Sequence, residues 1–147
     1  MTPTLVMTDA PDAQMRRAIV EPLRRFNEQH AGPSGFHALA VLLQHPETGE
    51  VIGGLWGDTS FSQFHVDLLV VPDTLRGSGL GRRLMRQGEE EAQRRGCVGA
   101  WLDTFSFQAR GFYERLGYTV FGTIEDFPPG HSRIFMKKRF ASSASAS

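Results

Sequence analysis

The chain of 147 residues has a single cysteine, Cys97, so no disulfide can form within it. Its sixteen basic and sixteen acidic side chains give a formal net charge of zero, which removes the attraction that draws proteins non-specifically to nucleic acids or anionic membranes. No apolar run approaches the roughly 20 residues that a membrane-spanning helix needs, and no N-terminal stretch has the pattern of a secretory signal. We therefore expect a cytoplasmic protein without a nucleic-acid or membrane partner.

Lysine is also scarce, with two residues, Lys137 and Lys138, against fourteen arginines. No lysine precedes Lys137, so the lysine of a phosphate-binding G-x-x-x-x-G-K-[ST] loop is missing. The five histidines show no metal-ligand spacing such as H-x-x-x-H, and we expect no metal. What the chain does contain is 40% apolar residues, enough for the core of one domain without disulfides or a structural metal.

Local patterns predict strands and helices along most of the chain. Alternating or β-branched apolar runs indicate strands, and apolar residues three and four apart indicate helices. Strands are predicted over 3–8, 36–44, 50–56, 63–71, 98–104, 118–125 and 132–140, and helices over 11–32, divided at Pro22, then 80–96 and 108–116. This order predicts a mixed sheet with helices packed on it, an α/β or α+β architecture. One domain over residues 1–140 and a disordered tail over 141–147 (ASSASAS) are expected.

Residues 70–84 (VVPDTLRGSGLGRRL) contain the segment most suggestive of chemistry. A strand leads through a loop with Gly77, Gly79 and Gly81 into a helix. Glycines at alternate positions let backbone N–H groups turn toward one point, with the positive end of the helix dipole behind them. This arrangement indicates a pyrophosphate site, although the spacing fits neither the dinucleotide fingerprint G-x-G-x-x-G nor a P-loop. The alternative is a loop that only turns the chain into the helix.

Two motifs, in this order, resemble those of the GNAT superfamily of N-acetyltransferases. Residues 76–81 (RGSGLG) match the acyl-CoA signature [RQ]-x-x-G-x-[GA], and residues 112–118 (FYERLGY) match a second motif, FYxxxG[FY]. The element order resembles the family over about residues 3–140. The resemblance implies a mixed, mostly antiparallel sheet of six to seven strands with about four helices, in which two strands splay apart around acetyl-CoA.

The resemblance also implies which residues bind acetyl-CoA. In the family, the strand before the signature pairs its free backbone groups with the pantetheine amides, and the signature's backbone amides bind the pyrophosphate. Many members place a further polar contact, commonly Asn, between the next strand and the second motif, where this chain has Ser106. The implied cofactor-binding residues are Leu69, Val70, Val71, Arg76, Gly77, Ser78, Gly79, Leu80, Gly81, Arg82 and Ser106. For Arg82, a solvated helix face is the alternative.

Three residues are catalytic candidates. By resemblance, Tyr113 lies near the sulfur of acetyl-CoA, where a phenol with an ordinary pKa near 10 can protonate the departing thiolate; a ring that only packs between helix and sheet is the alternative. His65 stands eleven residues before Arg76, where several members carry a catalytic Glu. Asp67 lies two positions further along the strand, so the two side chains share a face and can together remove a proton from an amine. The alternatives are two solvated polar residues, or water as the base.

The sequence therefore predicts an enzyme that transfers acetyl from acetyl-CoA to a primary amine by direct attack in a ternary complex. Competing hypotheses are an acyl-CoA-binding domain without transferase activity, and a domain that binds protein or nucleic acid and uses no CoA. The acceptor, a small molecule or a peptide, is left open because acceptor choice depends on variable loops. Its pocket is expected among aromatic residues near predicted strand ends, Trp56, Phe61, Phe105, Phe107 and Phe127, for each of which core packing is the alternative. A homodimer through the C-terminal strands is a further hypothesis.

Overall fold

The computed structural model describes residues 1–141, so the predicted tail lies outside the described residues except for Ala141. Contacts divide the chain into two compact units, with the boundary between Ser34 and Gly35. Within the described residues, no helix has both the length and the apolar character needed to cross a membrane.

The first unit contains one helix, α1 (Ala13–Ala31). Asp12 caps this helix, because its Oδ1 accepts a hydrogen bond of 2.8 Å from the N–H of Met15. The predicted division at Pro22 is wrong: α1 continues through Pro22, which lacks only one N–H of the helical ladder. The predicted strand over residues 3–8 is also wrong. A strand needs a ladder partner, and no described strand pairs with these residues.

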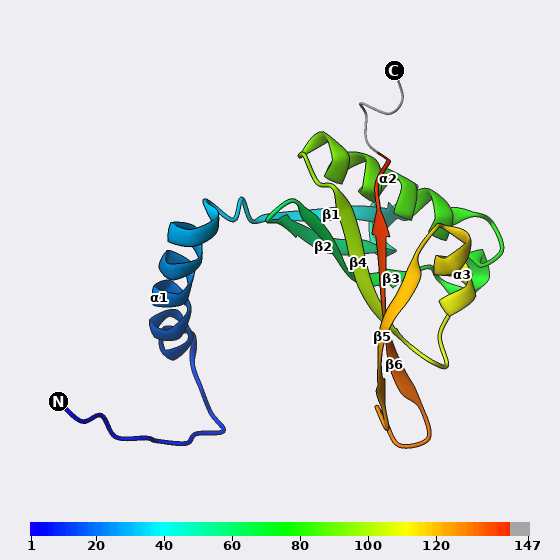
Figure 1. Cartoon of the computed structure of the whole chain (residues 1–147). Helices are drawn as coiled ribbons and strands as arrows, with labels where there is room; N and C mark the ends of the chain where they lie inside the picture. Colours follow the sequence, from blue (N-terminus) through cyan, green and yellow to red (C-terminus); the bar gives the residue numbers. More distant parts are fainter. Residues whose placement is uncertain (142–147) are drawn as a thin grey trace. The chain divides into compact units, whose positions relative to one another are not determined.

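The second unit is built on one sheet of six strands (Figure 1). The strand order is β1-β2-β3-β4-β6-β5, and the β3–β4 pair is parallel while the other four pairs are antiparallel. The strands are β1 (His37–Gln44), β2 (Val51–Ser60), β3 (Gln63–Val70), β4 (Gly99–Phe105), β5 (Thr119–Glu125) and β6 (Ser132–Arg139). The predicted mixed, mostly antiparallel sheet is confirmed.

Helices α2 (Leu80–Arg94) and α3 (Arg110–Arg115) and the short 3-10 turn η1 (Asp73–Leu75) complete this unit. Three α-helices are therefore described, close to the four or so predicted, and the difference arises because Pro22 does not divide α1.

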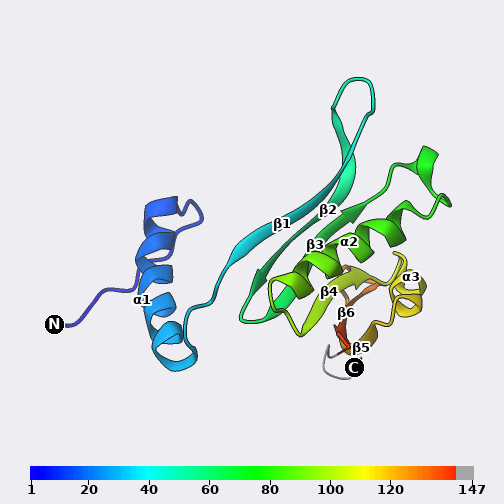
Figure 2. The ribbon, with the colours of Figure 1, turned by 90° about the horizontal axis from the view of Figure 1, so that it is seen from above.

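Helix α2 runs along the sheet (Figure 2) and packs tightly against it at Gly88. A Cβ added at Gly88 would lie 3.2 Å from both Leu55 Cδ1 and Phe64 Cζ, so a side chain there would require these neighbours or the helix to shift by a few tenths of an ångström. The largest fully buried side chains of the core are Tyr118, Phe64, Leu55, Met85, Leu102 and Met136. Because side chains alternate along a strand, neighbours of these residues on β3 and β4 lie on the opposite face of the sheet.

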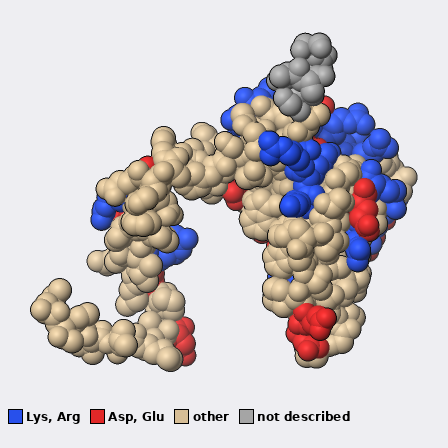
Figure 3. All heavy atoms as spheres, viewed as in Figure 1, with Lys and Arg blue, Asp and Glu red and all other residues tan. Residues whose placement is uncertain are grey.

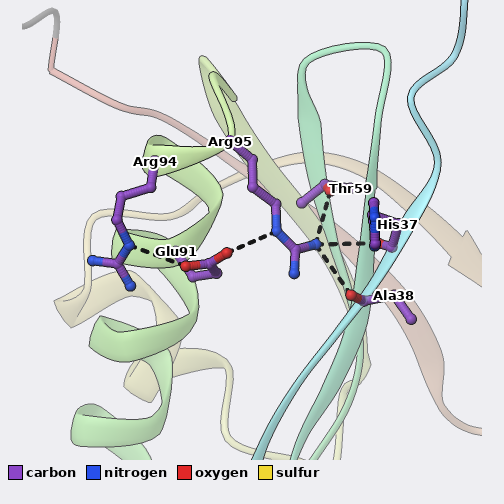
Figure 4. A network of polar contacts seen from close by, with 6 residues as sticks. All are labelled: His37, Ala38, Thr59, Glu91, Arg94 and Arg95. Carbon is purple, nitrogen blue, oxygen red and sulfur yellow. Dashed lines mark hydrogen bonds and ion pairs between the residues drawn. The ribbon is translucent and has the colours of Figure 1, made fainter.

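Arg95, directly after α2, ties the end of this helix to the sheet (Figure 4). Its Nη1 donates to the carbonyl oxygens of His37 and Ala38 at 3.3 and 3.1 Å and to Thr59 Oγ1 at 3.1 Å, while its Nε donates to Glu91 at 2.9 Å. One guanidinium thus joins the end of α2 to both β1 and β2.

A buried polar cluster joins α2 to the C-terminal strands. Glu89 of α2 is 8% exposed. Its Oε2 accepts a hydrogen bond of 2.8 Å from the Tyr118 hydroxyl, and its Oε1 lies 2.7 Å from Lys138 Nζ. Both carboxylate oxygens therefore have a partner, as a buried charge requires.

This cluster predicts an alkaline loss of stability. Burial, and next the Glu89 carboxylate, raise the pKa of Tyr118 well above its usual value near 10. Below about pH 10 the folded and unfolded chains both keep the phenol proton, whereas above it the unfolded chain loses the proton first. The free energy of unfolding should then fall by about 1.4 kcal/mol per pH unit for this group.

Urea unfolding on both sides of pH 10 measures this loss. Tyr118→Phe should be less stable than the wild type by roughly 1.5 kcal/mol near pH 8, because it loses a hydrogen bond to a charged group. It should lose stability less steeply than the wild type above pH 10. Parallel pH profiles for the two proteins would contradict the expectation.

Candidate active site

Strands β3 and β4 pair for only part of their length. The pairs run from Gln63 opposite Gly99 to Val66 opposite Leu102, and none follows in the described residues. Beyond this point β3 pairs with β2, and β4 pairs with β6. The part of β3 after Val66, with the predicted residues Leu69 and Val70, has no ladder partner on the β4 side among the described residues, and Val71 follows directly after the strand. Amide groups of a ligand can pair with it, as an added strand would.

A bulge in β3 lies at the start of this splay. Trp56 opposes Leu68, but the next residue, Gly57, opposes Val66, so Asp67 is one extra residue in β3. A bulge bends the strand that contains it and strengthens its twist. The extra residue therefore lies where β3 has to turn away from β4.

His65 belongs to the last but one β3–β4 pair before the two strands separate. Its side chain lies on the sheet face opposite α2. The carboxylate near it belongs to Asp58 of β2, whose Oδ2 is 3.8 Å from His65 Nδ1. Its ring stacks on Trp101 of β4 with a centroid distance of 4.0 Å and an angle of 15°. The expected pair of His65 with Asp67 is not formed; Asp67 is exposed and has no ion pair with another described residue.

The glycine loop follows β3 and leads through η1 into α2. Gly77 and Gly79 both have φ of 80°, and a Cβ added to either would meet no atom within 4 Å. Gly79 forms the N-cap of α2 without any side-chain hydrogen bond, and the first helical bond is made by the N–H of Arg83 to Gly79. The N–H groups of residues 77–82 bond to no other described backbone group, and they are available to a ligand at the positive end of the helix dipole.

Other predicted residues of this loop are arranged around these N–H groups. The side chain of Arg76 turns back to Asp73, with its Nη2 3.0 Å from Oδ1, and the Ser78 hydroxyl donates to the carbonyl of Leu75. A Cβ added at Gly81 would lie 3.2 Å from Phe112 Cζ, so this glycine lets α3 approach the start of α2. Arg82 is exposed on α2. Figure 3 shows basic side chains gathered over the α2 side of this unit.

Tyr113 of α3 packs between its neighbours without using its hydroxyl. Its ring meets those of Phe112 and Tyr118 edge to face, at centroid distances of 5.1 and 6.1 Å. The hydroxyl has no hydrogen bond to another described residue and is not sealed from solvent. Burial, and next the Asp103 carboxylate, raise the pKa of Tyr113. Its phenol therefore keeps its proton through neutral pH.

Asp103 follows the last β3–β4 pair and forms a cluster at the end of β4. Its Oδ1 accepts a hydrogen bond of 2.7 Å from Arg133 Nε, and the Arg133 guanidinium lies 5.0 Å from the ring centroids of both Phe105 and Phe127. The Ser106 hydroxyl, in the loop after β4, already has a partner: its Oγ accepts a hydrogen bond of 3.0 Å from the N–H of Ser132. Ser106 thus ties this loop to the start of β6.

Sequence reasoning missed the pairing of Asp58 with His65 and the functional candidates Trp101, Asp103 and Arg133. The signal for Asp58 was the tight turn at Phe61 and Ser62, which sets residue 58 opposite residue 65. Both turn residues have positive φ, 46° and 62°, and neither is the glycine or asparagine that usually marks such a turn.

The geometry is that of an acyl-CoA-binding protein: two parallel strands of a mixed sheet splay apart beside a glycine loop at a helix N-terminus. The backbone cradle has the room and the free N–H groups for a pyrophosphate, and the unpaired β3 edge can bind pantetheine amides. The model of the acetyltransferase (GNAT) family matches residues 7–118, so the chain belongs to this family of acetyl-CoA-dependent acetyltransferases.

Individual proteins agree with the family match. The chain is 37% identical over 135 residues to acetyltransferase Atu2258 of Agrobacterium fabrum, covering 92% of this chain and 98% of the relative. It is 47% identical over 116 residues to blasticidin-S acetyltransferase of Streptomyces morookaense, covering 78% and 83%. A crystal structure of an acetyltransferase-family protein from Agrobacterium tumefaciens matches with a TM-score of 0.88 at 36% identity, covering 93% of this chain and 99% of that one.

Proposed function

We propose that this enzyme transfers the acetyl group to the primary amine of a small molecule by direct attack in a ternary complex. The observation that supports it most is the unpaired β3 edge, which runs from the glycine loop to the last β3–β4 pair at Val66, the residue after His65. A thioester held along this edge has its pyrophosphate on α2 and its acyl end beside the point where β3 and β4 part.

Acetyl-CoA supplies an activated acyl group. The protein supplies a base, an acid and the groups that hold the cofactor. His65 takes a proton from the acceptor amine as its nitrogen forms the new bond to the acetyl carbon. Tyr113 gives its phenol proton to the sulfur as the carbon–sulfur bond breaks, and its raised pKa ensures that this proton is present at neutral pH. The backbone of β3, the glycine loop and α2 hold the cofactor in place.

The rim near the splay suits a cationic acceptor with a flat apolar part. Phe105 and Phe107 stack at 5.1 Å with an angle of 4° between rings, and Phe107 is 59% exposed. Figure 3 shows acidic side chains at the tip of the β5–β6 hairpin, which carries Glu125 and Asp126. The name of the blasticidin-S acetyltransferase relative supports an antibiotic amine as the first acceptor to test.

Release of free thiol from acetyl-CoA tests the proposal with a panel of blasticidin S, an aminoglycoside, a polyamine and a peptide with a free N-terminus. We expect turnover with at least one small-molecule amine and an acetylated product by mass spectrometry. Thermal stabilisation by CoA without thiol release would instead support a binding domain without transferase activity. No shift in Tm at millimolar acetyl-CoA would argue against use of CoA altogether.

The cradle makes a separate prediction for Gly79→Ala. At φ of 80° an alanine is strained by about 1–2 kcal/mol, and relief of this strain would turn the N–H groups of α2 away from the ligand. The Kd for CoA, measured by calorimetry, should rise roughly tenfold or more.

Gly96→Ala is the matched control. Gly96, past the other end of α2, has φ of 89° and equally open space, so it carries the same backbone strain without lying in the cradle. It should lower Tm to a similar extent and leave the Kd for CoA unchanged. A similar loss of CoA affinity in both variants would show that stability, and not the cradle, is responsible.

A further inference from the structure

We propose that Asp58 is the positioning residue for His65: its carboxylate keeps the imidazole proton on Nδ1 and leaves Nε2 free to accept the proton of the amine. The inference rests on the proposed function, in which His65 is the base. It replaces the expected partner Asp67 by a residue of the neighbouring strand.

The sheet register brings the two side chains together. Asp58 of β2 and His65 of β3 are directly opposite each other, because the two-residue turn at Phe61 and Ser62 pairs Ser60 with Gln63. Opposite residues on antiparallel strands point to the same face. Asp58 Oδ2 and His65 Nδ1 are 3.8 Å apart, within ion-pair range and longer than a hydrogen bond. The side chains are 29% and 23% exposed, so water screens their attraction only in part.

Trp101 supplies the second constraint on the imidazole. It is the parallel-strand partner of His65, and the two ring planes are nearly parallel, with their centroids 4.0 Å apart. Stacking sets the plane of the imidazole but leaves two orientations that differ by a flip about the Cβ–Cγ bond. The Asp58 carboxylate distinguishes them, because it attracts the N–H of Nδ1 and would repel an unprotonated nitrogen there. Stacking and charge together leave one orientation with Nε2 available.

The other charged groups on this face are already occupied or further along the strands. On β4, Asp103 is paired with Arg133. On β6, Lys137 lies opposite Trp101, and its Nζ is over the ring of Phe121. On β3, Asp67 lies in the bulge. The carboxylate that pairs with His65 is therefore that of Asp58.

Nitrogen-15 NMR of the histidine rings in the free protein tests the inference without any substrate. The His65 signals are assigned by their loss in His65→Gln. At a pH where His65 is neutral, we expect the pattern of the Nδ1–H tautomer in the wild type and a shift toward Nε2–H in Asp58→Asn. Asp67→Asn should leave the wild-type pattern. An Nε2–H pattern in the wild type, or a change in Asp67→Asn but not in Asp58→Asn, would overturn the proposal.

The pH profile of kcat/KM gives the catalytic readout. Without the Asp58 charge, the plateau should fall roughly tenfold as most of the His65 population adopts the wrong tautomer. Asp58→Glu should restore part of the plateau, which a loss of folding would not allow. If His65→Gln has the wild-type profile while the NMR result holds, the assignment of His65 as the base has failed and the pairing has not.

Discussion

Tyr113→Phe is expected to lower kcat by roughly 100- to 1,000-fold, because the thiolate must then leave without a proton donor. The phenol of Tyr113 is held protonated by burial and by the nearby Asp103 carboxylate, both of which raise its pKa. Phenylalanine keeps the ring contacts with Phe112 and Tyr118 and removes only the oxygen. Steady-state release of thiol at saturating amine measures kcat, and the KM for acetyl-CoA should change little.

Two properties separate this catalytic effect from a structural one. The Tyr113 hydroxyl bonds to no other described residue, so the Tm of Tyr113→Phe should stay close to that of the wild type. Tyr118→Phe removes a hydroxyl five residues away that is bound to Glu89, so it should lower Tm and keep kcat. Wild-type turnover in Tyr113→Phe would remove this residue from the mechanism and leave its ring with a packing role only.

Glu89→Ala is expected to be the most destabilising single change considered. It removes the partner of the Tyr118 hydroxyl and of the Lys138 ammonium together, and leaves a buried hydroxyl and a partly buried charge without a partner. Breaking a buried pair in this way costs about 3–5 kcal/mol. For a unit of this size such a loss lowers Tm on the order of 10 °C, which calorimetry or circular dichroism measures directly.

Glu91→Ala is the matched control two residues further along α2. Glu91 pairs with Arg94 and Arg95 at 3.0 and 2.9 Å, and its side chain is 37% exposed against 10% for Glu89, so solvent screens these pairs more strongly. A much smaller decrease in Tm is therefore expected than for Glu89→Ala. Equal decreases would mean that the buried cluster contributes no more than the more solvent-exposed pairs of Glu91.

Local patterns were enough to predict the elements in the middle of the chain. The period of apolar residues from Leu80 onward and the stop at Gly96 predict α2 nearly to its observed ends, because the helix carries both its amphipathic face and its end signal in its own residues. The N-terminal predictions failed for the opposite reason. A β-prone segment at residues 3–8 forms no strand without a partner, and Pro22 weakens α1 without ending it.

The length of β2 shows a second limit of local patterns. The sequence predicts a strand that ends at Trp56, whereas β2 continues to Ser60. Gly57 has no Cβ, and this lets the β3 backbone lie close: a Cβ there would be 2.2 Å from the carbonyl oxygen of His65. Glycine ordinarily weakens a strand, and here it permits the close approach beside the bulge. That role is visible only once β3 is in place.

The sequence by itself determined the family, the glycine cradle and the helix behind it, since residues that are neighbours in the chain build all of the cradle. The scarcity of lysine excluded a P-loop, and backbone N–H groups make that lysine unnecessary. Only the tertiary structure decided which carboxylate accompanies His65, where β3 leaves β4, and which charges surround Tyr113. These depend on strand register, and a bulge of one residue changes which side chains meet across a sheet.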